Sequence, residues 1–143
     1  MKYMGLDVGS KRIGVAVSDE FGWTAQPVTT ISRKKQDDDF QRIMDMIDEY
    51  DVSEIVIGLP KNMNGSIGAS AQKVMEFADC LKGNLNIPVQ FWDERMSTQA
   101  VTRTLLEADV SRKKRKKVVD KLAAAYILQG YLDFIEFKGD NIP

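Results

Sequence analysis

Three segments of the sequence place carboxylates where burial would be costly. Asp7 ends the apolar run MGLD, Asp93 and Glu94 end the run PVQFWDE, and Asp120 stands at the start of the apolar pattern DKLAAAYILQGY. An unpaired carboxylate inside a protein is strongly destabilising, so carboxylates that converge on one place predict a cation among them. Because side chains alternate along a strand, only one of Asp93 and Glu94 can face the same side as Asp7. The spacing alone leaves that choice open.

The residue types favour metal-dependent chemistry on phosphate esters. Carboxylate oxygens are hard ligands that suit Mg²⁺ or Mn²⁺, and one or two such ions can activate a water molecule and stabilise the leaving oxygen of a phosphodiester. The sequence has no histidine, which excludes Ser-His-Asp and Cys-His catalysis and histidine-bound zinc. Cys80 is the only cysteine, which excludes an internal disulfide. Its place beside the apolar line of a helix predicts that it is buried.

Each carboxylate also has a local structural interpretation. Asp7 could form an Asx-turn over Gly9, Asp120 could cap a helix that begins at Lys121, and Glu94 could pair with Arg95. One at a time these interpretations are favoured. Two strand ends and the start of a packed helix can nevertheless meet at one edge of a sheet, which favours a shared site.

Basic residues form a second pattern. The formal net charge is −1, but one segment reads RKKRKK, and the rest of the chain then nets −7. Such a run predicts a polyanion partner, and a solvated helix face is the alternative. Candidate nucleic-acid contacts are the residues of this run and the cations next to the carboxylates, namely Lys11, Arg12, Arg95, Arg112, Lys113, Lys114, Arg115, Lys116 and Lys117.

The pattern of apolar residues predicts the elements that position these side chains. Strands are expected at residues 2–8, 12–18, 28–32, 54–60 and 88–94, and helices after the acidic triplet 37–39 up to Tyr50, at 66–82, from Ser97, and from the basic run to about Phe137. Short links between the first three strands imply an antiparallel meander, and helical crossovers then imply two parallel strands. The expected fold is α/β, a five-stranded mixed sheet with helices on both faces, in a single domain over residues 1–143. Ligands of such sheets bind at the carboxyl ends of the parallel strands.

Targeting signals are not evident in the sequence. No apolar stretch approaches the roughly 18 residues that span a bilayer, and the start MKYMGLDVGS lacks the long apolar region of a signal peptide. The expected location is the cytoplasm, with no membrane partner.

Four motifs in series resemble one family over nearly the whole chain. They are DVGSKRIGVAVSD, GLPKNMNGSIGASA, DERMST and RKKRKKVVDKLAAAYILQGYL, and together they are similar to the YqgF family of pre-16S ribosomal RNA nucleases, also called Holliday junction resolvase-like proteins. The resemblance implies a ribonuclease H-like fold. It also implies that Asp7, Glu94 and Asp120 bind the divalent metal and carry catalysis, which selects Glu94 over Asp93.

Several alternatives stay open. The substrate implied by the resemblance is precursor ribosomal RNA, with branched DNA as the alternative of a Holliday junction resolvase, and a non-catalytic module that binds RNA or the ribosome is a third interpretation. Ribosomal proteins or small-subunit assembly intermediates could present the substrate, and the chain could act as a monomer or a homodimer. Actin-like kinases share the Asp-x-Gly-Ser hairpin, but they close two such lobes over ATP, and 143 residues supply one.

Overall fold

The described part of the chain forms one mixed sheet with helices on either side. The computed structural model describes residues 1–62, 64–93 and 112–140, with side chains of the last segment described from 121 to 136. Its elements, in chain order, are β1 (Tyr3–Val8), β2 (Arg12–Ser18), β3 (Ala25–Ser32), α1 (Gln36–Tyr50), β4 (Glu54–Leu59), α2 (Ala69–Lys82), β5 (Val89–Asp93) and α4 (Arg112–Asp140). The helix expected from Ser97 lies outside the described residues.

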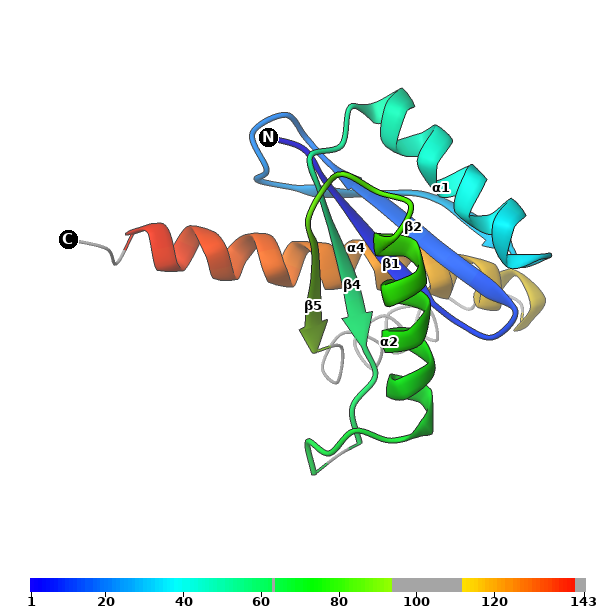
Figure 1. Ribbon diagram of the computed structural model, residues 1–143. Helices are drawn as coiled ribbons and strands as arrows, with labels where there is room; N and C mark the ends of the chain where they lie inside the picture. Colours follow the sequence, from blue (N-terminus) through cyan, green and yellow to red (C-terminus); the bar gives the residue numbers. More distant parts are fainter. Residues whose placement is uncertain (63, 94–111, 141–143) are drawn as a thin grey trace.

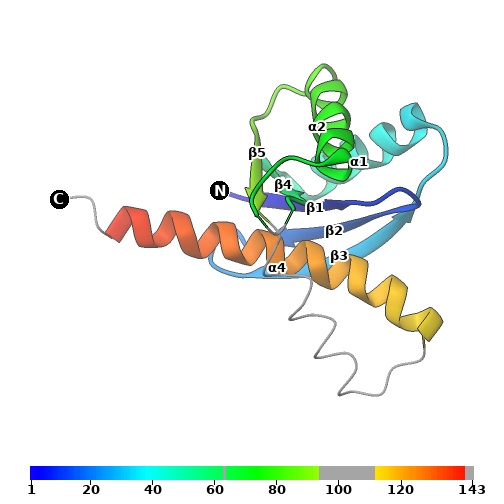
Figure 2. The same cartoon turned by 90° about the horizontal axis from the view of Figure 1, so that it is seen from below.

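The strand order confirms the expected fold class. Within the described residues the five strands are arranged β3-β2-β1-β4-β5. β1 pairs antiparallel with β2, and β2 with β3, whereas β4 runs parallel to both β1 and β5. Figures 1 and 2 show three layers, with α1 and α2 on one face of the sheet and α4 across the other. The carboxyl ends of β1, β4 and β5 therefore lie at the same edge of the sheet.

Because side chains alternate along the strands, each face of the sheet has its own apolar core. In β1, Met4 and Leu6 belong to the apolar cluster under α1 and α2, whereas Tyr3 packs with the cluster under α4. Every residue of β4 is buried, as expected of a central strand that is covered on both faces. The helices complete the first cluster with buried side chains such as Phe40 of α1 and Phe77 of α2, whose rings meet edge to face with centroids 5.1 Å apart.

Gly5 allows α4 to lie close to the sheet. A Cβ atom at this position would come within 2.8 Å of both the carbonyl oxygen of Ala124 and the Cβ of Leu128. Real Cβ atoms do not approach other atoms so closely, so only glycine permits this contact. The middle strand and the helix therefore pack backbone against backbone.

Some details differ from the sequence-based expectations. β3 begins at Ala25 rather than at 28, because Ala25 pairs with Ser18 of β2 and its N–H donates to Oε1 of Gln129 on α4 at 2.9 Å. The pairing shifts register between Val15 and Ala16, opposite the proline-containing part of β3, and such a bulge is invisible to a simple alternation pattern.

Cys80 is exposed, so the expectation that it is buried is wrong. The buried line of α2 runs through Phe77, Ala78 and Leu81, and Cys80 lies just outside it. The helix is also shorter than expected, because it begins at Ala69 and the residues from Ser66 form part of the preceding loop.

Among the helices that the structure describes, none combines the length and the apolar character that a bilayer-spanning segment requires.

Candidate functional site

Asp7 lies near the carboxyl end of the middle strand β1, opposite Gly14 of β2. Because Leu6 faces the core under α1 and α2, alternation places Asp7 on the opposite face, which α4 covers. The N–H of Gly9 donates to the carbonyl oxygen of Arg12 at 2.8 Å, so backbone atoms close this turn. This bond occupies the N–H of Gly9 that an Asx-turn would use, and the Asx-turn interpretation of Asp7 stays a prediction. The carboxylate is half-buried at the edge where ligands of such sheets bind.

α4 runs antiparallel to β1 across this face. The ring of Tyr131 lies 6.1 Å from that of Tyr3, and one step further along β1, Ala124 and Leu128 lie against Gly5. The next residue of β1 on this face is Asp7, and one helical turn before Ala124 is Asp120. The backbone of α4 thus continues towards the same edge, and in both ribbon views its first turns lie at the same end of the sheet as the turn between β1 and β2 (Figures 1 and 2).

The interpretation of Asp120 as a helix cap is wrong. α4 begins at Arg112, so Asp120 lies two turns inside the helix. The side chain of Asp120 is outside the part of the chain whose side chains are described, and its role as a metal ligand stays a prediction.

β5 ends at Asp93, the first of the two candidate acidic residues on this segment. Trp92 packs with the cluster under α4, whereas Phe91 packs with the cluster under α1 and α2. Asp93 therefore shares the face of Phe91, opposite to that of Asp7. Glu94 lies outside the described residues. The position of Asp93 argues against it as the partner of Asp7 and leaves Glu94 as the candidate.

The predicted basic contacts are described in part. Lys11 is exposed in the turn after Asp7, and Arg12 lies on the face of Asp7 by alternation with Ile13. Arg95 is outside the described residues. The run 112–117 forms the first turns of α4, and its side chains are not described.

A cavity of about 450 Å³ opens beside the turn between β1 and β2. Its volume is within the range of roughly 300–1,000 Å³ that is usual for ligand sites. The turn, the end of β4 and the first turns of α2 enclose it, and its charged lining residues are Asp7, Arg33 and Lys73. The hydroxyl-bearing residues Ser10 and Ser70 also line it. Alternation along β1 directs the Asp7 carboxylate to the face of α4, so the cations Arg33 and Lys73 give the cavity a net positive character.

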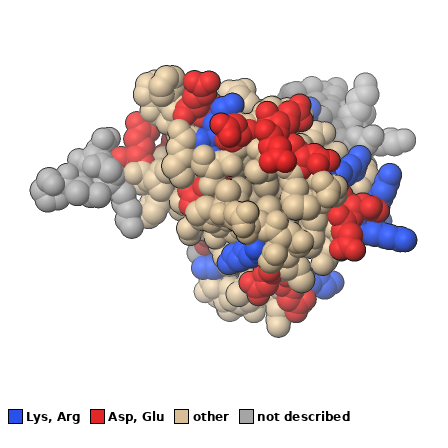
Figure 3. Space-filling model, turned by 45° about the horizontal axis from the view of Figure 1, so that its top comes forward, with Lys and Arg blue, Asp and Glu red and all other residues tan. Residues whose placement is uncertain are grey.

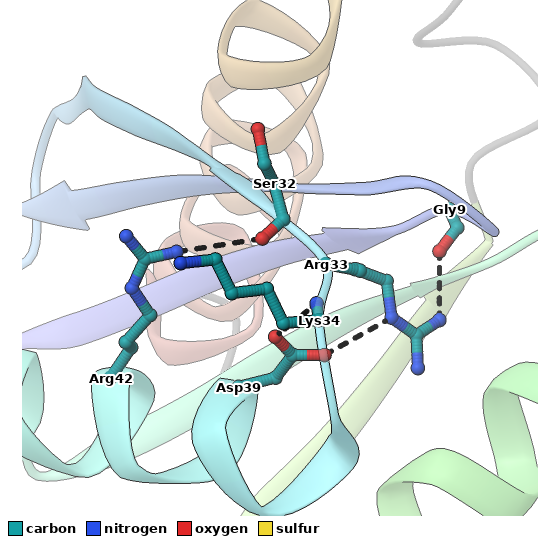
Figure 4. A network of polar contacts seen from close by, with 6 residues as sticks. All are labelled: Gly9, Ser32, Arg33, Lys34, Asp39 and Arg42. Carbon is teal, nitrogen blue, oxygen red and sulfur yellow. Dashed lines mark hydrogen bonds and ion pairs between the residues drawn. The ribbon is translucent and has the colours of Figure 1, made fainter.

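Arg33 is held by partners from three parts of the chain, and Figure 4 shows its contacts with the turn after β1 and with α1. Its Nη1 donates to the carbonyl oxygen of Gly9 at 2.9 Å, and its Nε donates to Oδ2 of Asp39 at 3.5 Å. Its guanidinium also lies 5.2 Å from the ring centroid of Phe77. Asp39 is fully buried, and its other oxygen accepts the backbone N–H of Lys34 at 3.1 Å. The network thereby connects the turn after Asp7 to both helices on the far face.

The sequence does not single out Arg33 or Lys73. Arg33 opens the run RKK before the acidic first turn of α1, which is a common pattern at a helix start, and Lys73 is one of several charged residues on α2. Only the fold brings the two cations to one cavity. A signal that could have indicated Arg33 is Asp39, a carboxylate directly beside the apolar Phe40 of the helix.

Of the three predicted metal ligands, Asp7 lies among the described side chains. Among the described side chains, no group of three acidic or cysteine residues lies close enough to hold an ion. Two of the three predicted ligands, Glu94 and Asp120, fall outside those side chains. The chemistry of the predicted donors, all carboxylates, fits a hard divalent cation.

The outer face of α1 is acidic. Exposed carboxylates of Asp45, Asp48 and Glu49 follow those of Asp37 and Asp38, and Figure 3 shows acidic side chains along the upper part of this face. This face repels a polyanion, so a nucleic acid is expected at the edge of the sheet near Asp7 rather than along α1.

The comparisons with known proteins point to one family. The model of the family described as "RuvX: Holliday junction resolvase" matches residues 1–134. A relative from Clostridium acetobutylicum is 54% identical over 135 residues, which are 94% of this chain and 100% of the relative, and one from Clostridium beijerinckii is 56% identical over 138 residues, which are 96% of this chain and 100% of the relative. Both relatives carry the name "putative pre-16S rRNA nuclease".

Solved structures share the fold at low sequence identity. RuvC from T. thermophilus, in complex with a Holliday junction substrate, is 14% identical with a TM-score of 0.58, over 95% of this chain and 96% of that one. The yeast mitochondrial Holliday junction resolvase is 8% identical with a TM-score of 0.59, over 97% of this chain and 80% of that one. These likenesses confirm the ribonuclease H-like architecture.

Proposed function

Because the chain belongs to the RuvX family, also called YqgF, we propose that it is a nuclease that hydrolyses phosphodiester bonds in the precursor of 16S ribosomal RNA. The observation that carries this proposal is the position of Asp7, a half-buried carboxylate at the carboxyl edge of the sheet. The names of relatives that match nearly the whole chain support ribosomal RNA as the substrate. The reaction belongs in the cytoplasm, where ribosomes assemble.

Asp7, Glu94 and Asp120 are the proposed catalytic residues and the proposed ligands of one or two Mg²⁺ or Mn²⁺ ions. When bound, such ions supply Lewis acidity and lower the pKa of a bound water. The carboxylates fix the position of the reacting centre at the edge of the sheet, and α4 supports it from one face. The cations Lys11, Arg12, Arg95 and the run 112–117 would contact phosphates of the substrate strand and orient it.

A second candidate function is the resolution of four-way DNA junctions. The description of the matching family model names this activity, and the same carboxylate chemistry would serve it. Symmetrical cleavage of a junction calls for a two-fold dimer. The two candidate functions therefore differ in the expected oligomeric state as well as in the substrate.

Cleavage assays test the proposal. The protein would be incubated with an RNA that spans the 5′ flank of 16S RNA, a four-way DNA junction or a single-stranded control, in Mg²⁺, Mn²⁺ or EDTA. Asp7→Asn should reduce the cleavage rate by at least about 100-fold, because it removes a ligand and its negative charge. Asp79→Asn, on the exposed side of α2, is the matched control and should keep the wild-type rate.

The outcomes distinguish the candidates. Cleavage that persists in Asp7→Asn contradicts the three-carboxylate mechanism. A cut confined to the DNA junction, by a protein that is dimeric in solution, selects the resolvase. Salt-sensitive RNA binding without cleavage of any substrate selects the binding module.

A further inference from the structure

The cavity beside Asp7 contains cations that the proposed reaction does not yet use. Lys73 is exposed on α2, and no ion pair joins it to a carboxylate within the part of the chain that the structure describes. Ser70 lies three residues earlier, on the same side of the helix, and both line the cavity. Lys73 and Ser70 therefore place one exposed cation and one hydroxyl on the wall that faces the turn after Asp7.

Arg33 forms a fixed cation on another wall of the same cavity. Its side chain is only 24% exposed, and the carboxylate of Asp39 and the carbonyl of Gly9 hold two of its nitrogens. A guanidinium has five N–H donors, so these two bonds leave donors for a ligand. Ser10, from the turn, adds a further hydroxyl. The groups at the cavity, apart from Asp7, are thus mainly donors and cations.

A phosphate group of a polynucleotide is the ligand that this arrangement suits. It offers charged oxygens to Lys73 and to the planar fork of Arg33, which matches phosphate geometry. We infer that Lys73 and Arg33, with the hydroxyls of Ser10 and Ser70, bind a phosphate of the substrate strand that neighbours the phosphate to be cleaved. This inference rests on the proposed function, because it takes the strand that passes Asp7 as the ligand.

The alternation of β1 explains why this phosphate is not the reacting one. The side chain of Asp7 is on the face of α4, whereas Lys73 belongs to α2 on the other face of the sheet. A polynucleotide strand that bends around the edge of the sheet, over the turn between β1 and β2, reaches both Asp7 and Lys73. The cavity would then hold the strand on one side of the turn while the carboxylates act on the other side.

The salt dependence of RNA binding tests this site without any cleavage. A fluorescently labelled single-stranded RNA from the 5′ flank of 16S RNA would be titrated with full-length protein in EDTA, between 50 and 200 mM salt. Each phosphate contact to a single strand contributes about 0.7 to the slope of log K against log salt. Lys73→Gln should therefore lower the magnitude of the slope by about 0.7 and weaken binding about fivefold at 0.1 M salt.

Two further variants serve as controls for Lys73→Gln. Lys2→Gln removes the same charge at the opposite edge of the sheet, where Lys2 precedes β1, and should leave the slope unchanged. Lys73→Arg keeps the charge and should keep the slope. A merely structural role of Lys73 would change the melting temperature and would not change the slope by the value of one contact.

The two proposals can fail separately. An unchanged slope in Lys73→Gln, with cleavage that still requires Asp7, overturns the phosphate site and leaves the nuclease intact. A reduced slope in Lys73→Gln, with no cleavage by the wild type, overturns the nuclease and leaves a nucleic-acid-binding cavity. A reduced slope in Lys2→Gln of the same size also overturns the site, because the effect would then be one of net charge.

Discussion

Gly5 is a residue at which the structure tolerates little change. Its missing side chain lets the carbonyl of Ala124 and the Cβ of Leu128 contact β1 directly. The contact lies one step from Asp7 along the same face of the strand. The packing that stabilises the fold therefore also sets how deeply α4 sits beside the candidate site.

We expect Gly5→Ala to lower the free energy of unfolding by about 1–3 kcal/mol, because the new Cβ must displace backbone and not only a flexible side chain. Gly83→Ala is the matched control, since its Cβ would lie 3.4 Å from the carbonyl oxygen of Cys80 at an ordinary helical φ of −62°. The control should change stability by less than about 1 kcal/mol. Urea denaturation of both variants measures the difference, and equal midpoints would contradict the packing argument.

Single residues could be predicted from the sequence only where chemistry and pattern agree. Asp7 stands out because a charge ends an apolar run, and the structure places it at the expected edge. Lys73 and Arg33 do not stand out, because each is an ordinary surface cation until the fold brings them to one cavity. Cys80 was misplaced because a residue next to an apolar helical line can fall on either side of it.

α4 is the element on which most of the proposed function depends. It covers one face of the sheet with buried residues such as Ile127 and Leu128, and it includes the basic run and Asp120. Gln129 also joins it to the start of β3 and its preceding turn, because its Nε2 donates to the carbonyl of Trp23 at 2.9 Å while its Oε1 accepts the N–H of Ala25. Its position along the sheet is therefore fixed by hydrogen bonds as well as by packing.

Tyr3 and Tyr131, which meet where α4 packs against β1, give a prediction for alkaline pH. Burial, and then the charge of Glu54, raise the pKa of Tyr3 and of Tyr131 above the ordinary value of 10.0 for a tyrosine. The folded protein thus holds these protons longer than the unfolded chain does. Stability from this source is complete below pH about 10 and is lost as the pH rises from there through the raised pKa values.

We expect the free energy of unfolding to fall above pH about 10 more steeply in the wild type than in a Tyr3→Phe, Tyr131→Phe double variant. Glu54→Gln should reduce the steepness in part, because it removes the second cause of the shift. Urea denaturation at each pH measures these slopes. Identical slopes in the wild type and the double variant would show that the two tyrosines do not titrate differently on folding.

The order and type of the described elements were predictable because their hydrophobic periods are clear. The boundaries of the elements were less predictable, as the early start of β3 shows. Ala25, Gln26 and Pro27 have low strand propensity, and their pairing depends on β2 and on Gln129, which is more than 100 residues away. Long-range contacts of this kind leave no local signal.

At the scale of the whole molecule, α4 contacts all five strands of the sheet. β1 separates two apolar clusters and contributes to both, so neither cluster is complete without the middle of the sheet. This arrangement favours the prediction that residues 1–143 form a single cooperative domain.

Calorimetry can test that prediction. We expect one thermal transition with an enthalpy of roughly 100 kcal/mol, from about 0.7 kcal/mol per residue, and a van't Hoff enthalpy equal to the calorimetric one. Two resolved transitions, or a ratio of the two enthalpies well away from one, would contradict a single domain. Circular dichroism and tryptophan fluorescence should give coincident transitions in the same experiment.

The two outer strands of the sheet, β3 and β5, have a consequence for self-association. β3, at one edge, contains Pro27 and lies against a bulge, and β5, at the other edge, is only five residues long. Prolines, bulges and short strands all discourage a second chain from adding to an edge. A continuous sheet through two copies, and fibril-like stacking of the folded protein, are therefore disfavoured. If two copies do associate on a branched substrate, they would meet through helices or loops, and either strand edge would stay free of the interface.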